Sequence, residues 1–122
     1  GVQTCALPIS IVPRSAGGGW TVTQSGSALD VIPASASLVN GTVESPSGWI
    51  RPVNLLRLAS PQPVASLTLA TALVPRSSAP SPQVTQENRG GDLRVHVGGD
   101  EIVFAQTADG YVIAGVTTAP RP

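Results

Sequence analysis

Residues 92–116 read DLRVHVGGDEIVFAQTADGYVIAGV, a series of short apolar and polar runs separated by turn residues. In its first run, apolar Leu93 and Val95 alternate with polar Arg94 and His96, which is the two-residue period of a strand with one buried face. Two short segments rich in Gly and Asp interrupt the alternation, and such segments favour tight turns between antiparallel strands. The pattern therefore predicts a meander with strands at residues 92–97, 101–106 and 111–116.

The same alternation occurs upstream of the meander. Residues 20–24 (WTVTQ) and 28–32 (ALDVI) flank a short Ser-Gly turn and predict a β-hairpin. Further strands are expected at residues 54–59 and 66–74, on either side of a proline-containing break. Residues 75–82 (PRSSAPSP) then form a Pro/Ser loop, which we expect to cross the surface between two sheets.

About seven to nine short strands at this spacing predict an all-β fold, an antiparallel β-sandwich, with a small barrel as the alternative. The dipeptide Asn40-Gly41 favours one further tight turn. The composition agrees with this fold class, because 12 Pro and 13 Gly in 122 residues leave little room for long helices. A chain of this length corresponds to one domain.

The charges of the chain cancel, since seven Arg and no Lys face seven acidic residues. The Arg residues are scattered, and the basic stripe with stacking aromatics that marks a nucleic-acid binder is missing. No apolar run is long enough to span a bilayer, and no basic cluster suits an anionic lipid surface. We therefore expect neither a nucleic-acid partner nor a membrane partner.

The first nine residues, GVQTCALPI, are similar to the conceptual translation of a common short-read sequencing adapter. We interpret residues 1–9 as a foreign segment, with a genuine N-terminal strand or leader as the alternative. On this interpretation Cys5, the only cysteine, carries no chemistry. Residues 10–19 then read as a linker and residues 20–118 as the β-sandwich domain, which we expect to be a C-terminal fragment of a larger protein.

The residues that could carry chemistry are few. A carboxylate pair would need two acids in one cleft, and Asp92 and Glu101 are the pair that could face one another across the hairpin. Asp100 and Asp109 fall in turns, where Asp is favoured for backbone hydrogen bonding, so we favour turn and surface roles for all four acids.

His96 is the sole histidine and lies on the polar side of its strand, which is typical of a surface residue more than of a general base. One imidazole without a thiol is too little for zinc, and no calcium-loop pattern occurs. The triple glycine at residues 17–19 precedes a strand and not a helix, so it does not match a phosphate cradle. We therefore predict no catalytic residue, no metal site and no cofactor.

Trp20 and Trp49 carry the one indication of binding. An exposed indole on a β-sandwich can stack on a sugar ring, as in carbohydrate-binding modules. The alternative, which we favour, is that both residues fill space in the core or anchor loops, since the chain has only two other aromatic residues.

A family resemblance begins at Trp49. Residues 43–51 (VESPSGWIR) resemble the Ser-Pro and Gly-Trp loop near the end of heparinase II/III-like polysaccharide lyases. In that family a strand of the type T-x-L-x-P follows the loop, here residues 71–75 (TALVP), and the hairpin at residues 20–32 fits a family hairpin upstream. The resemblance covers about residues 20–116, and its motifs are short.

The resemblance implies a helical toroid followed by a C-terminal β-sandwich, in a bacterial enzyme that cleaves uronic-acid polysaccharides by β-elimination. The family's catalytic Tyr, His and Arg lie mainly on parts that this chain lacks, and neither Tyr111 nor His96 stands in a family motif. The sequence also departs from the family by lacking the second histidine of a structural zinc site.

We therefore expect a non-catalytic, extracellular or periplasmic sandwich whose partners are its own missing catalytic domain and a polysaccharide. An accessory carbohydrate-binding module and a structural, adhesin-like β-domain are the alternatives.

Overall fold

The computed structural model describes residues 9–14, 17–34, 39–45, 54–77 and 79–120. These residues form strands, turns and extended segments and contain no helix, so the all-β prediction is confirmed. Within this part of the chain no helix is available that could cross a membrane. The strands are β1 Ser10–Pro13, β2 Trp20–Gln24, β3 Ser27–Pro33, β4 Asn40–Glu44, β5 Leu55–Ala59, β6 Thr71–Pro75, β7 Val84–Arg89, β8 Asp92–Val97, β9 Asp100–Thr107 and β10 Gly110–Thr117.

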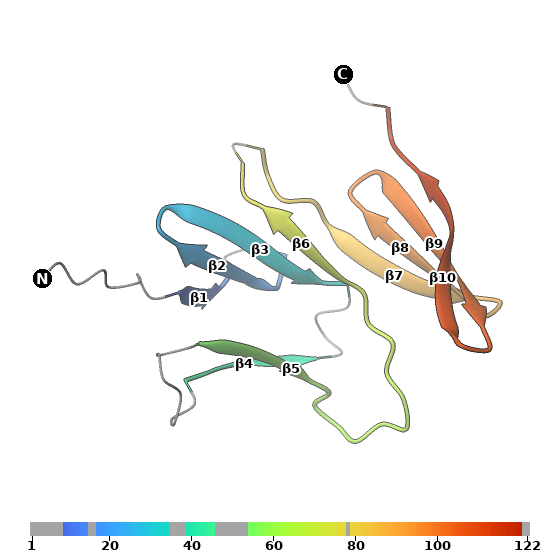
Figure 1. The fold of residues 1–122 in the computed structure, drawn as a ribbon, viewed down its shortest axis with the longest axis horizontal. Coiled ribbons are helices and arrows are strands. Elements are labelled where there is room, and N and C mark those ends of the chain that lie inside the picture. The colour runs from blue at the N-terminus through green and yellow to red at the C-terminus, as the bar shows by residue number, and fades with distance from the viewer. Residues whose placement is uncertain (1–8, 15–16, 35–38, 46–53, 78, 121–122) are drawn as a thin grey trace, which may run out of the picture.

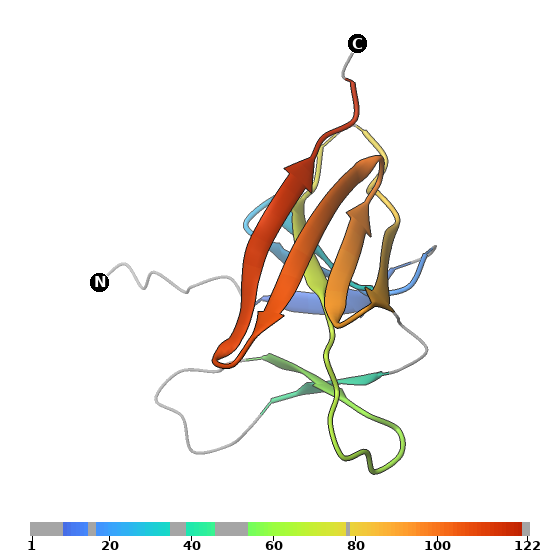
Figure 2. The same cartoon turned by 90° about the vertical axis from the view of Figure 1, so that its right-hand side faces the viewer.

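The strands form three antiparallel sheets (Figures 1 and 2). Sheet I has the strand order β1-β2-β3-β6, and sheet II has the order β10-β9-β8-β7. Strands β4 and β5 pair only with each other and make a separate ribbon below sheet I in Figure 1. Sheet II is the predicted meander with one additional strand, β7, at its edge.

The core lies where β3 and β6 of sheet I meet β7 and β8 of sheet II. Its buried members come from both sheets, as in a β-sandwich. Leu93 and Val95 point into it, whereas Arg94 and His96 on the same strand remain partly exposed, so the predicted division of β8 into two faces is confirmed. We call the core-facing side of each sheet its inner face. The buried cluster is Ile32, Ala34, Val84, Leu93 and Val95, with Ala70, Ala72, Val74, Val97 and Phe104 packed against it.

The interpretation of residues 10–19 as a linker is wrong for the first four of them. Ser10–Pro13 forms β1 and pairs with β2, from Ser10 opposite Thr23 to Pro13 opposite Trp20. A strand is possible here despite Pro13 because β1 is the edge of sheet I, where a proline need not donate a ladder hydrogen bond.

Three other local predictions differ from the structure. Asn40-Gly41 is not a turn, because both residues begin strand β4. The strand expected from residue 66 begins only at Thr71, and residues 66–70 belong to no strand. Val84–Arg89, which the sequence analysis left without a strand, pairs along its whole length with β8 as β7.

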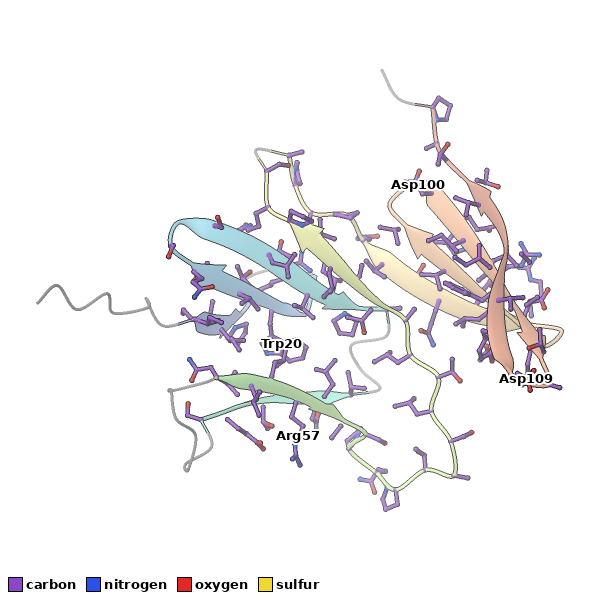
Figure 3. The ribbon with its side chains drawn as sticks, in the orientation of Figure 1. Trp20, Arg57, Asp100 and Asp109 are labelled. Atoms are coloured by element: carbon purple, nitrogen blue, oxygen red, sulfur yellow. The ribbon has the colours of Figure 1, made fainter. Side chains whose placement is uncertain are left out.

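Gly41 lies in a strand because an indole occupies the space of its missing side chain. A Cβ atom built on Gly41 would lie 1.9 Å from Cζ2 of Trp20. Trp20 pairs with Val31, whose neighbour Ile32 points into the core, so the indole stands on the outer face of sheet I. Figure 3 shows Trp20 between sheet I and the β4–β5 ribbon. Trp20 therefore docks this ribbon onto the sheet.

Replacing Gly41 with Ala should displace the indole and weaken the docking. We expect Gly41→Ala to lower the free energy of unfolding by about 1–3 kcal/mol, the usual effect of overpacking, in urea denaturation. Gly115→Ala is the matched control, because a Cβ there meets no atom within 4 Å, and it should change stability by less than about 0.5 kcal/mol. Equal losses in the two variants would contradict the docking role of Trp20.

Candidate functional site

The most unusual polar residue of the described chain is Asp30, which is buried on the inner face of sheet I. It shares this face with Ile32 because the two are two residues apart on β3. Only 1% of its surface is exposed. A carboxylate at this depth is expensive to bury unless hydrogen bonds and charges compensate it.

Four side chains compensate the carboxylate of Asp30. The hydroxyl of Thr21, directly opposite on β2, donates to Oδ1 at 2.8 Å. The hydroxyl of Ser81 donates to Oδ2 from the connection between β6 and β7. Two guanidinium groups approach Oδ2 through their Nε atoms, Arg14 at 3.7 Å and Arg76 at 3.6 Å.

These contacts keep Asp30 ionised. The hydrogen bond from Ser81 is the largest influence and lowers the pKa of Asp30, and the bond from Thr21 and the charges of Arg76 and Arg14 lower it further. Burial acts in the opposite direction and raises the pKa, but the net direction is downward. An anion held in this way is a poor proton acceptor at neutral pH, so the arrangement suits binding and structure more than acid–base catalysis.

An open cleft of about 540 Å³ lies beside this cluster. The two arginines follow strands at either side of it, Arg14 after β1 and Arg76 after β6. Sheet I supplies hydroxyl groups to its surface, and the β6–β7 connection adds a proline and a serine. The lining residues are Val12, Pro13, Arg14, Thr21, Thr23, Asp30, Arg76, Pro80 and Ser81.

This site was not predicted from the sequence. In the run ALDVI, Asp30 alternates with the apolar residues Leu29 and Val31, so the pattern places it on the polar face of its strand, and nothing in the alternation indicates that this face is the buried one. The partners of Asp30 could not be inferred from the sequence either, because the hydroxyl of Ser81 comes from 51 residues further along the chain.

Of the two tryptophans predicted as sugar-binding candidates, the structure describes one. Trp20 is half-buried, and its ring edge lies against Gly41. This is the anchoring role that the sequence analysis favoured. Trp49 lies outside the described residues.

The predicted facing of Asp92 and Glu101 is wrong. Asp92 stands opposite Arg89 of β7, whereas Glu101 stands opposite His96 of β8, because the β8–β9 turn sets a register in which Val97 pairs with Asp100.

Of the two acids expected in turns, Asp109 lies in the β9–β10 turn, whereas Asp100 begins β9 and pairs with Val97, so the two are at opposite ends of this strand (Figure 3). Asp100 accepts a hydrogen bond from the Ala119 amide at 2.9 Å, and the Asp109 amide donates to Thr107.

His96 belongs to a charged row on the outer face of sheet II. Its Nε2 lies 3.5 Å from Glu101 and 4.0 Å from Glu87, and Arg94 donates to Glu101 at 3.1 Å. Half-exposed pairs of this kind contribute little to stability. Among the described residues, no three His, Cys, Asp or Glu side chains gather in a way that could hold a metal ion.

Comparison with protein-family models, with curated proteins and with solved structures finds no match for the chain. The site therefore has to be interpreted from its own geometry. In that geometry, a buried carboxylate whose two oxygens both have partners lies beside an open cleft that contains two guanidinium groups.

Removing the charge of Asp30 should destabilise the fold. We expect Asp30→Asn to lower the free energy of unfolding at pH 7 by about 3 kcal/mol, because it leaves two guanidinium groups without their buried counter-charge. Asp109→Asn, in the exposed β9–β10 turn, should change it by less than about 0.5 kcal/mol. Similar values for the two variants in urea denaturation would contradict the role of Asp30.

The Asp30→Asn variant also tests how much of the pH dependence of folding stability comes from the Asp30 carboxylate. Because the pKa of Asp30 is lower in the folded chain than its ordinary value of 3.8, its ionisation stabilises the fold above that value. This stabilisation is lost as the pH falls below 3.8 toward the folded pKa. The stability difference between the native sequence and Asp30→Asn should therefore narrow between pH 4 and pH 2, and a difference that is constant with pH would contradict the lowered pKa.

Proposed function

We propose that this chain is a non-catalytic β-sandwich module that packs against another domain of a larger protein. Following the sequence resemblance, we propose that this protein is a heparinase II/III-like polysaccharide lyase acting outside the cytoplasm. The missing partner would then be the helical toroid that cleaves uronic-acid polysaccharides. The support from the structure is a strip of core-type surface that nothing in the described chain covers.

The registers of sheet II define this strip. Residues directly opposite one another in a sheet share a face, and Leu93 pairs with Phe104, which pairs with Ile113. Leu93 lies in the buried core, so the inner face continues through Phe104 to Ile113 on β10. The next row runs in the same way from Val95 through Ile102 to Val116.

Along each of these rows the side chains become more exposed from β8 to β10. Leu93 is 5% exposed, whereas Ile113 in the same row is 65% exposed. Val116 and Tyr111, which lie on the same face of β10, are also exposed. Covering such side chains contributes about 1.5–3 kcal/mol each, so a second domain seated on β10 would gain several kcal/mol. We call Tyr111, Ile113 and Val116 the β10 strip.

The positions of the polar groups agree with a non-catalytic module. The buried acid, Asp30, lies on the inner face of sheet I, and His96 lies on the outer face of sheet II. The alternative of an accessory carbohydrate-binding module depended on Trp20 and Trp49, and the contact of Trp20 with Gly41 favours an anchoring role for that indole.

Two truncations in one row test whether the β10 strip is bare in this chain. Leu93→Ala should lower the free energy of unfolding by about 3 kcal/mol, the range for a buried leucine. Ile113→Ala removes a similar side chain from the same face and should change it by less than about 0.5 kcal/mol. A comparable loss in both variants, measured by urea denaturation, would contradict the proposal, because the strip would already be covered.

The catalytic part of the proposal has its own test. The purified chain should release no unsaturated uronate from uronic-acid polysaccharides, as followed by ultraviolet absorbance, whereas the complete parent protein should release it. Product formation by the chain alone would contradict its assignment as non-catalytic. A parent reading frame without a toroid before residue 20 would contradict the assignment to a lyase.

A further inference from the structure

We propose that the cleft beside Asp30 is a binding site for a small organic carboxylate, with Arg76 as its principal anchor. This inference concerns sheet I and the β6–β7 connection, so it does not depend on the β10 strip or on the parent protein. It is carried by the charge of the cleft, the free donor capacity of one arginine and the nature of the walls.

The charge in the cleft does not cancel. Arg14 and Arg76 bring two positive charges to a single carboxylate, so the cluster carries one net positive charge. The carboxylate of Asp30 is turned toward its four partners and is almost wholly buried. An entering anion would therefore meet the exposed guanidinium side of the cluster before it met Asp30.

The two arginines differ in what they can still bind. Arg14 is only 13% exposed and donates through Nη1 to the carbonyl oxygen of Gly18 at 2.7 Å. Arg76 is 58% exposed and reaches Asp30 through Nε at 3.6 Å, and among the described residues no second acceptor contacts its guanidinium group. A guanidinium has five N–H donors in a planar fork that matches a carboxylate. Arg76 thus has donors to spare on the side away from Asp30.

The backbone positions Arg76 for this role. Its amide donates to the carbonyl oxygen of Ala28 at 2.9 Å, which extends the pairing of β3 with β6 by one residue. The side chain therefore starts from a fixed point at the edge of sheet I. A fixed origin lowers the entropy that a long side chain loses when it binds.

The walls favour an organic ligand over an inorganic ion. Val12, Pro13 and Pro80 give the cleft apolar surface beside the guanidinium groups, and Thr23 adds a hydroxyl group. A volume of about 540 Å³ holds a molecule of several carbon atoms. A dianion such as sulfate loses more hydration on entering the cleft and gains nothing from these apolar walls, so the cleft suits an organic monoanion better.

The test is a titration of the complete chain with sodium benzoate at constant ionic strength, followed by backbone amide shifts in ¹H–¹⁵N spectra. The amides of Thr21, Arg76 and Ser81 should shift and saturate at millimolar benzoate. Sodium sulfate should produce shifts that are at least tenfold weaker. Shifts that rise linearly with either salt, or that are equal for the two, would overturn the proposal.

Two arginine variants complete the test. Arg76→Gln should weaken benzoate binding at least tenfold. Arg57→Gln is the matched control, because Arg57 is 69% exposed and also reaches one carboxylate through Nε at 3.6 Å, but on the β4–β5 ribbon away from the cleft (Figure 3). Binding that survives Arg76→Gln, or that Arg57→Gln weakens equally, would overturn the proposal. If Arg76→Gln does not fold, Arg76→Lys replaces it, and full benzoate affinity in that variant would overturn the proposal, because an ammonium group lacks the planar fork of donors.

Discussion

The buried carboxylate of Asp30 is the interaction on which the arrangement of sheet I depends. It accepts hydrogen bonds from β2 and from the β6–β7 connection, and it attracts the arginines that follow β1 and β6. The side chain of Asp30 thus links every strand of sheet I to the loop that leads to sheet II. Such a cluster is strong only while all its members are present, because each lost partner leaves a buried charge less compensated.

The position of Asp30 also explains how the two sheets are offset. On sheet I, the inner face is apolar at β3 and β6, where Ile32 and Val74 meet sheet II, and polar toward β2, where Thr21 and Asp30 line the cleft. On sheet II, β7 and β8 are covered, whereas β10 is not. Each sheet therefore covers only half of the other.

The parts of the two inner faces that the facing sheet leaves uncovered have opposite chemistry. On sheet I this part carries hydroxyls and charges that pair with one another, and Thr21 and Asp30 are buried there beneath Ser81 and the two arginines. The free half of sheet II consists of large apolar side chains on an uncharged edge strand, a combination that soluble proteins usually avoid. This contrast is the physical reason for proposing a partner domain for β10 and a small organic carboxylate for the cleft.

Much of the fold could be predicted because apolar and polar residues alternate within the individual strands. The meander, its turns and the two faces of β8 follow from residues 92–116 alone. Strand β7 could not be found in this way, because VTQENR is largely polar and forms a strand through backbone pairing with β8. The Asn40-Gly41 dipeptide was misleading, since the glycine is required by the indole of Trp20 and not by a turn.

The candidate site was less accessible to sequence reasoning than the fold. Asp30 alternates with apolar Leu29 and Val31, so sequence reasoning places its charge toward solvent, and its burial depends on distant groups that compensate it. Arg14 and Arg76 appear in the sequence only as two of seven scattered arginines. The uncovered β10 strip likewise could not be predicted, because YVIAGV has the pattern of a buried strand whether or not a second layer covers it.

Strand β8 lies inside the sandwich, whereas no described part of the chain covers the apolar inner face of β10. Amide hydrogen exchange of the isolated chain tests this most directly, because exchange reports the local free energy of opening. We expect the amides of Asp92–Val97 to exchange at least a hundredfold more slowly than those amides of Gly110–Thr117 that are bonded to β9. Equal protection of the two strands would contradict it, since β10 would then already be part of a closed core.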